Sequence, residues 1–145
     1  MKRDYPERPM VGVGAIILRN QPFPQVALVK RGNPPLKGEW TIPGGVLELG
    51  EELEAGARRE AREETGLEVR MTGAVEVFDR IVRDEKGEVE FHYVLIDYVC
   101  EVESGELCAG GDAVDARWFS HEELGKAGVS EFTAGVVGKH LASGP

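Results

Sequence analysis

The chain has 145 residues, the length of one domain, and we therefore predict a single domain over residues 1–145. Its 26 Asp and Glu residues outnumber its 17 Lys and Arg residues, which gives a net charge of −9. This charge argues against a protein that binds a nucleic-acid polymer or an anionic membrane, because both partners require a basic surface.

The N-terminal segment, residues 1–10, carries charges and two prolines but no apolar core, so it does not resemble a secretory signal. No later run approaches the ~20 apolar residues that span a bilayer. Two cysteines, Cys100 and Cys108, are too few for a disulfide framework. We therefore predict a cytoplasmic location, reduced thiols and no membrane partner.

Two apolar runs follow this segment. Residues 11–18 and 26–30 are rich in β-branched residues and predict two strands. The prolines between them predict a loop, so the pair should form a hairpin with a long connection. Residues 31–39 predict another loop, and residues 40–43, which end in proline, predict a short extended segment.

The strongest helix signal lies at residues 51–65, which are rich in Glu, Ala and Arg. Gly66 stands where a helix commonly ends with a glycine. Residues 69–82 and 89–102 are then long runs of Val, Ile, Phe and Tyr. An Asp-Glu-Lys-Gly turn separates them, and together they predict one antiparallel hairpin.

The C-terminal part predicts three shorter elements. Residues 116–119 form a short strand. Ser120 and Glu123 have the spacing of a capping box, which predicts a helix at 121–126. Residues 130–141 predict the last helix.

The helix at 51–65 has an unusual distribution of charge. At ~100° per residue, Ala57 and Ala61 mark the side that packs against the sheet, and three carboxylates lie on or beside that side. These carboxylates belong to Glu60, Glu63 and Glu64. Clustered, partly buried carboxylates persist where a cation neutralises them, and oxygen ligands suit Mg²⁺ or Mn²⁺. The alternative is a solvated acidic helix with ion pairs such as Arg59 with Glu63.

The residues around this helix form a longer pattern. Gly45 is followed by five residues, Glu51, seven residues, and then Arg-Glu-Ala-Arg-Glu-Glu-Thr-Gly-Leu at 59–67. The pattern resembles the signature box of the Nudix hydrolases, in which Arg-Glu-aliphatic-any-Glu-Glu-any-Gly-aliphatic follows the same two spacings. Every fixed polar and glycine position is filled. Ala61 is smaller than the usual aliphatic residue, which affects packing rather than chemistry.

The resemblance implies an α/β (α+β) fold: a mixed, curved β-sheet between helices, arranged as an α/β/α sandwich. It also implies a Mg²⁺-dependent enzyme, with Mn²⁺ as a substitute, that hydrolyses a pyrophosphate bond in a nucleoside diphosphate derivative. The implied metal ligands are Glu60, Glu63, Glu64 and the main-chain carbonyl of Gly45. Arg59 would orient a glutamate of the box, such as Glu51.

The general base is not fixed by the box. Some Nudix enzymes use a box glutamate, here Glu63 or Glu64, and others use an acid on a later loop. The loop before the strand at 116–119 supplies Asp112 and Asp115, of which we favour Asp112. The alternative for Asp112 is an ordinary turn residue, because Asp is common in turns.

The substrate is less clearly indicated. Arg31 and Arg80 are candidates to bind phosphates, and Phe78 is a candidate to contact a nucleobase, although loop arginines are often only solvated and strand aromatics often belong to the core. We favour a nucleotide sugar such as ADP-ribose, cleaved to AMP and a sugar phosphate. The alternatives are a nucleoside triphosphate pyrophosphohydrolase that cleans the nucleotide pool and a non-catalytic Nudix-like nucleotide sensor. The expected partner is thus a small-molecule nucleotide, and a homodimer is compatible with the resemblance.

Overall fold

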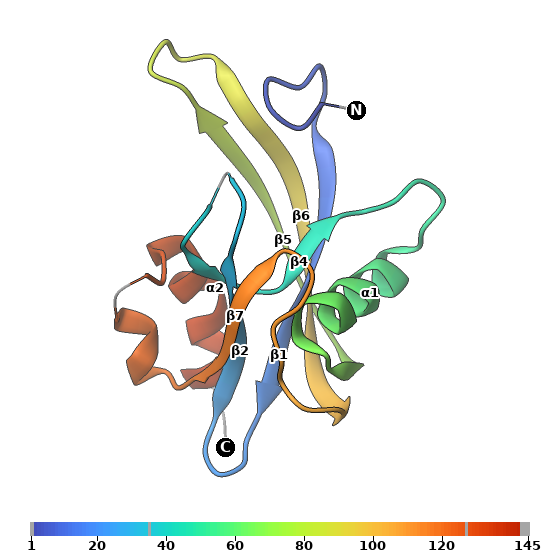
Figure 1. The fold of residues 1–145 in the computed structure, drawn as a ribbon, viewed down its shortest axis with the longest axis vertical. Coiled ribbons are helices and arrows are strands. Elements are labelled where there is room, and N and C mark those ends of the chain that lie inside the picture. The colour runs from blue at the N-terminus through green and yellow to red at the C-terminus, as the bar shows by residue number, and fades with distance from the viewer. Residues whose placement is uncertain (1, 35, 127, 143–145) are drawn as a thin grey trace.

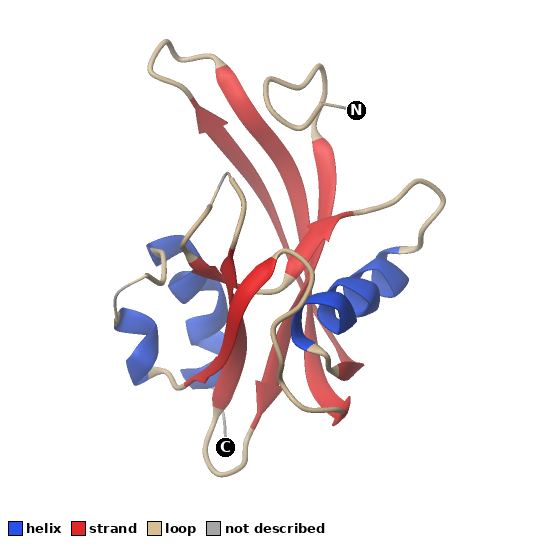
Figure 2. Ribbon diagram, viewed as in Figure 1, coloured by secondary structure: helices blue, strands red, loops and turns tan. Residues whose placement is uncertain are grey.

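The computed structural model describes residues 2–34, 36–126 and 128–142, and within them seven strands form one mixed β-sheet. Figures 1 and 2 show helix α1 (Leu53–Thr65) on one face of the sheet and helix α2 (Glu131–Ala142) on the other. The α/β/α sandwich expected from the sequence is therefore confirmed. The strands are β1 (Met10–Arg19), β2 (Gln25–Arg31), β3 (Trp40–Thr41), β4 (Gly44–Val46), β5 (Glu68–Arg83), β6 (Val89–Ser104) and β7 (Ala113–Phe119).

Strand β1 is the centre of the sheet and divides its pairing among three neighbours. It runs parallel to β6 from Met10 to Leu18. Its last two residues pair with β2, whereas residues 12–14 pair with the short strand β4. The predicted hairpin of β1 and β2 is thus present, but the two strands diverge after two residue pairs, and β4 lies beside β1 at the other end.

Alternation along β1 separates two hydrophobic cores. Ile16 faces α2, whereas Ala15 and Ile17 face α1. The core under α2 contains Ile16, Val26, Leu28, Trp40, Val99, Phe119, Leu124, Val136, Val137 and Leu141. The core under α1 contains Ala15, Ile17, Ala27, Ala61, Leu67, Val69 and Cys100.

Some predicted elements differ from the structure in where they begin or in their type. Helix α1 begins at Leu53 rather than Glu51, because residues 48–51 form a turn in which the Glu51 N–H donates to the Glu48 carbonyl. Strand β7 begins at Ala113 rather than residue 116, since it pairs with β2 from Val26 to Arg31. The capping box of Ser120 and Glu123 forms both of its hydrogen bonds, but the element that follows is a 3₁₀-helix, η1 (Glu122–Gly125), instead of an α-helix.

The long hairpin of β5 and β6 is confirmed, with 16 residues in each strand. Gly66 ends α1 in the left-handed conformation, as expected, and its N–H donates to the Arg62 carbonyl. Strand β5 pairs only with β6 among the described strands, so its other edge is open. No helix in the described part of the chain is long and apolar enough to cross a membrane.

Candidate active site

Helix α1 presents carboxylates toward strand β4. Ala57 and Ala61 are fully buried, as predicted from the helical spacing. Glu60 and Glu64 lie beside them and are only 8% and 4% exposed. Glu63 differs, because 53% of its side chain is exposed. Two of the three predicted carboxylates are therefore buried, and the third lies at the rim.

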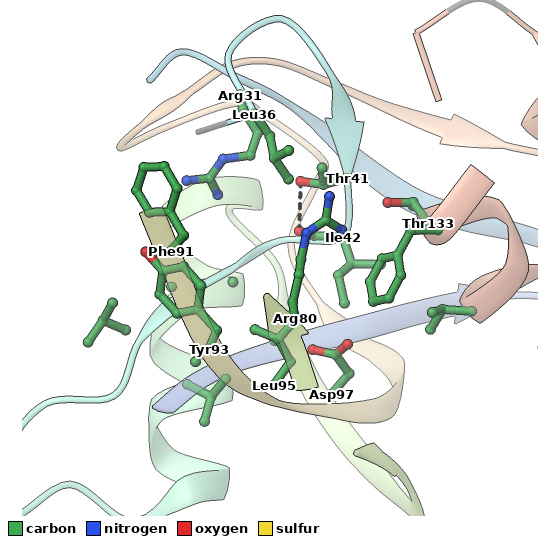
Figure 3. Close-up of a pocket in the computed structure, with 18 of the residues that line it drawn as sticks. Arg31, Leu36, Thr41, Ile42, Arg80, Phe91, Tyr93, Leu95, Asp97 and Thr133 are labelled. Carbon is green, nitrogen blue, oxygen red and sulfur yellow. Dashed lines mark hydrogen bonds between the residues drawn. The ribbon is translucent and has the colours of Figure 1, made fainter. Parts of the chain in front are cut away.

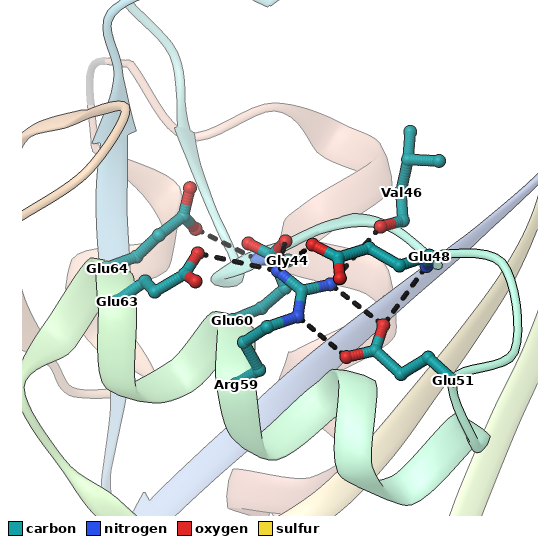
Figure 4. Close-up of polar contacts among 8 residues, drawn as sticks. All are labelled: Gly44, Val46, Glu48, Glu51, Arg59, Glu60, Glu63 and Glu64. Carbon is teal, nitrogen blue, oxygen red and sulfur yellow. Dashed lines mark hydrogen bonds and ion pairs between the residues drawn. The ribbon is translucent and has the colours of Figure 1, made fainter. Parts of the chain in front are cut away.

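Arg59 connects four carboxylates (Figure 4). Its guanidinium donates to both oxygens of Glu51, over 2.7 Å and 2.9 Å, and to Oε1 of Glu60 over 2.8 Å. A longer contact of 3.4 Å reaches Glu63 Oε2, and Glu48 Oε1 is 3.8 Å away. The ion pair expected between Arg59 and Glu51 is thus present. The hydrogen bond from Arg59 lowers the pKa of Glu51 to about 2 and so keeps this carboxylate ionised.

Burial dominates the electrostatics of Glu64. Its Oε1 accepts a hydrogen bond of 3.0 Å from the Gly44 N–H, which alone would favour the ionised form. Desolvation outweighs that bond and raises the pKa of Glu64 to about 7, with a further increase from the negative charge of Glu60. Burial also raises the pKa of Glu60, although the Arg59 guanidinium opposes the shift.

Gly45 permits the close approach of Glu60 to strand β4. A Cβ atom at Gly45 would lie 2.5 Å from Glu60 Oε1 and 2.7 Å from Glu60 Cδ. A Cβ atom does not approach a non-bonded atom this closely in real structures, so any side chain at Gly45 would displace the Glu60 carboxylate. The glycine of the sequence pattern is therefore required because the Glu60 carboxylate lies directly against its backbone.

The donor chemistry of this cluster fits a hard divalent ion. Glu60 and Glu64 are buried carboxylates whose pKa values are raised by desolvation and by the negative charges of neighbouring carboxylates, so a cation beside them would stabilise their ionised forms. Across the described ranges, no three Asp, Glu, His or Cys side chains are already arranged to hold a metal ion. In the structure, the Arg59 guanidinium contacts both Glu60 and Glu63.

A cavity of about 150 Å³ (Figure 3) is lined in part by Gly44 and Gly45 of β4. Arg31 and Arg80, both predicted as phosphate ligands, line it. Arg31 is also near enough to Glu64 for its positive charge to lower the pKa of that carboxyl. The cavity and the carboxylate cluster thus share a border formed by β4 and Arg31.

Two other predicted residues lie apart from the cavity. Phe78 is absent from the lining, because its ring packs against the core and edge-on to Phe132 of α2, with 5.5 Å between ring centroids. Asp112 lies on the exposed loop before β7, where its carboxylate accepts a hydrogen bond of 3.2 Å from Asn33. Its charge nevertheless acts on Glu60 and Glu64, whose pKa values it raises.

Sequence reasoning missed several residues of the cavity, namely Asp97, Phe132 and Thr133, and it selected Phe78 rather than Phe91 or Tyr93 from among the strand aromatics. One signal was available for Asp97. The alternation of β6 places positions 91, 93, 95 and 97 on one face, and an acid among apolar residues on an inward face indicates a functional group.

Comparisons with known proteins agree with this geometry. A family model of the NUDIX domain matches residues 8–137. An ADP-ribose pyrophosphatase from Methanocaldococcus jannaschii is 37% identical over 118 residues, which are 81% of this chain and 66% of that protein, just under two thirds of its length. A Bacillus subtilis protein provisionally named 8-oxo-dGTP diphosphatase is 37% identical over 112 residues, which are 77% of this chain and 68% of that protein.

Solved structures show the same fold. The crystal structure of a MutT NUDIX hydrolase from Burkholderia pseudomallei superposes with a TM-score of 0.72 and 27% identity, and the match covers 94% of this chain and 100% of that one. The family model, the Gly45–Leu67 box and the fold agree, and the chain belongs to the Nudix family.

Proposed function

We propose that the protein is a divalent-cation-dependent pyrophosphohydrolase, and that its substrate is a nucleotide sugar such as ADP-ribose, which it cleaves to AMP and a sugar phosphate. The observation that carries this proposal is the common border between a buried carboxylate cluster and a cavity with aromatic walls. The Methanocaldococcus jannaschii relative, which is named as an ADP-ribose pyrophosphatase, supports the substrate class.

The residues divide the work of this reaction. Glu60, Glu63, Glu64 and the main-chain carbonyl of Gly45 would hold the ion, and Mg²⁺ is the ion we propose, with Mn²⁺ as a substitute. A bound divalent ion neutralises phosphoryl charge and lowers the pKa of water. Arg59 holds Glu51, Glu60 and Glu63 in a fixed arrangement.

Other groups would remove the proton from water and bind the phosphates. Glu63 at the rim, Glu64 beside Gly44 and Asp112 on the loop before β7 are the candidates to accept a proton from the attacking water. Arg31, which borders both the cluster and the cavity, would bind the diphosphate. Arg80 lines the same cavity and would bind the part of the substrate that lies away from the carboxylate cluster.

A nucleoside triphosphate is the second candidate substrate. The Bacillus subtilis relative, with its provisional name of 8-oxo-dGTP diphosphatase, favours this alternative. The same carboxylates and the same cavity would serve both reactions, because each breaks a phosphate anhydride. The two candidates differ in their products.

A substrate panel tests the proposal. With Mg²⁺ present, we expect ADP-ribose to give AMP and ribose phosphate, and we expect excess EDTA to abolish this turnover. Chromatography of the products of ADP-ribose, other nucleotide sugars, dinucleotides and nucleoside triphosphates is the measurement. Release of pyrophosphate from triphosphates alone would support the second candidate. Activity that resists EDTA would contradict the metal mechanism, and nucleotide binding without any turnover would indicate a sensor.

We also propose that two copies associate through the face of β5 that carries Val75, Val77 and Ile81, which are 46%, 63% and 44% exposed. Apolar residues in a row beside an open sheet edge are typical of an interface. We expect wild type to have the mass of a dimer in light scattering and Val77→Asp that of a monomer. The control is Val114→Asp on β7, a position with 65% exposure, which should leave the dimer intact. A monomeric wild type would contradict this proposal.

A further inference from the structure

The floor of the cavity holds a buried acid without a partner. Asp97 is 4% exposed and lines the cavity, and no hydrogen bond or ion pair joins its carboxyl to another described residue. In Figure 3 its carboxyl points into the cavity, at the end opposite to Arg31. Burying a carboxyl that makes no hydrogen bond is costly, and native proteins rarely do so without a reason. The position therefore indicates a group that bonds to a ligand.

The backbone is built to accommodate this side chain. Strands β1 and β6 run in parallel register, with Gly14 opposite Asp97 and Gly12 opposite Leu95. A Cβ atom at Gly14 would lie 2.6 Å from Asp97 Oδ1, and a Cβ atom at Gly12 would lie 2.9 Å from Leu95 Cδ2. The two glycines thus leave room on this face of the sheet both for the carboxyl and for the cavity above it.

The walls of the cavity suit a flat ring. On one side, the rings of Phe91 and Tyr93 are nearly parallel, with 11° between their planes. Phe132 of α2 also lines the cavity, and the Arg80 guanidinium lies 4.6 Å from the centroid of its ring. Aromatic faces and a guanidinium plane are the groups on which nucleobases stack. A base that enters between them would direct one polar edge toward Asp97.

We propose that the Asp97 carboxyl is the group that selects the substrate's nucleobase, that it forms hydrogen bonds with the polar edge of the base, and that the selected base is adenine. This inference rests on the nucleotide hydrolase function proposed above, and it assigns the adenosine end of the substrate to the floor of the cavity. The diphosphate then lies toward Arg31 and Gly45, beside the carboxylate cluster.

The choice of adenine follows from the adenosine-containing substrate proposed above, and the environment of the carboxyl agrees with it. Desolvation raises the pKa of Asp97 to about 7, and the nearby Glu76 carboxylate adds to the shift. A neutral carboxyl offers one O–H donor and one acceptor oxygen. Adenine presents the complementary pair, a ring nitrogen acceptor beside its amino donor. An ionised carboxylate only accepts, and it would instead match the adjacent N–H donors of guanine.

Equilibrium binding of nucleoside monophosphates tests this assignment without requiring turnover. We expect wild type to bind AMP more tightly than GMP in calorimetry. Asp97→Asn keeps one donor and one acceptor, so its AMP affinity should stay within about threefold of wild type. Asp97→Ala removes both and should weaken AMP binding by roughly 10-fold or more, as expected for two lost hydrogen bonds. The matched control is Glu103→Ala, an exposed acid on the same strand β6, which should leave AMP affinity unchanged.

The outcomes separate this inference from the proposed function. An Asp97→Ala protein with unchanged AMP affinity would overturn the inference, whatever the substrate panel shows. Tighter binding of GMP, together with equal losses in Asp97→Asn and Asp97→Ala, would overturn the choice of adenine. Thermal melting of each variant confirms that the binding data come from folded protein, and Asp97→Asn keeps the test valid should Asp97→Ala fail to fold. Failure of the substrate panel with normal AMP binding would contradict the hydrolase function alone.

Discussion

Glu64→Gln is expected to lower turnover by ~10² or more while the protein stays folded. Glu64 is 4% exposed and accepts a hydrogen bond from Gly44. The amide of glutamine has the same shape and keeps an oxygen that can accept this bond, so packing is preserved. The negative charge offered to a divalent ion is lost. Steady-state kinetics with Mg²⁺, together with a thermal melt, measures both parts of this expectation.

The direction in which Glu64→Gln shifts the melting temperature can also be predicted. Burial holds the pKa of Glu64 near 7 in the folded chain, above the ordinary value of 4.5 that applies to the unfolded chain. The unfolded chain therefore loses this proton more readily, and ionisation of Glu64 destabilises the fold increasingly as the pH rises from about 4.5 to above 7. Without metal at pH 8, Glu64→Gln should melt at a higher temperature than wild type.

The control for Glu64→Gln is Glu54→Gln on the same helix. Glu54 has 54% of its side chain exposed and lies 3.9 Å from Arg58, so its loss should leave turnover near that of wild type. Near-normal turnover by folded Glu64→Gln would remove Glu64 from the set of metal ligands.

Gly45→Ala is expected to reduce turnover by ~10², because an ångström-scale displacement of a catalytic group has effects of this size. The added methyl group would meet Glu60 at 2.5 Å, so the carboxylate must move away from β4. Kinetics and circular dichroism of the same preparation separate this effect from unfolding. The change differs from Glu64→Gln in that every charge of the cluster is retained.

The control for Gly45→Ala is Gly135→Ala in helix α2. Apart from the backbone of its own helix and its chain neighbours, no described atom lies within 4 Å of the Cβ position at Gly135, and the residue is exposed. Alanine here should leave turnover unchanged and stabilise the fold by about 0.5–1 kcal/mol, since glycine is unfavourable inside a helix. If Gly45→Ala were as active as Gly135→Ala, close contact between Gly45 and Glu60 would not matter for the reaction.

The carboxylate cluster could be predicted from the sequence because its geometry is local. Glu60, Glu63 and Glu64 belong to one helix, and a repeat of 3.6 residues per turn fixes their relation to Ala57 and Ala61. The end of that helix at Gly66 could also be predicted from the sequence. The beginning of the helix could not be predicted, because glutamate is a good helix former. Only the contacts of Glu51 with Glu48 and Arg59 place it in the preceding turn.

The cavity could not be predicted in the same way. Phe78 and Phe132 are both aromatic residues in regular elements, and their roles depend on where α2 packs against β5. The importance of Asp97 depends on the parallel register that places it opposite Gly14. These relations join segments far apart in the chain, and no periodicity within one segment encodes them.

Arg59 has a consequence for the stability of the carboxylate cluster when no divalent ion is bound. Its guanidinium already contacts Glu51, Glu60 and Glu63, so the acidic cluster contains its own counter-charge. The fold therefore does not require a metal ion to hold these carboxylates together. A zinc finger, by contrast, is unfolded without its ion. With the metal site proposed above, the protein would stay folded when divalent ions are scarce, and its activity would follow the free concentration of the ion without a cycle of unfolding and refolding.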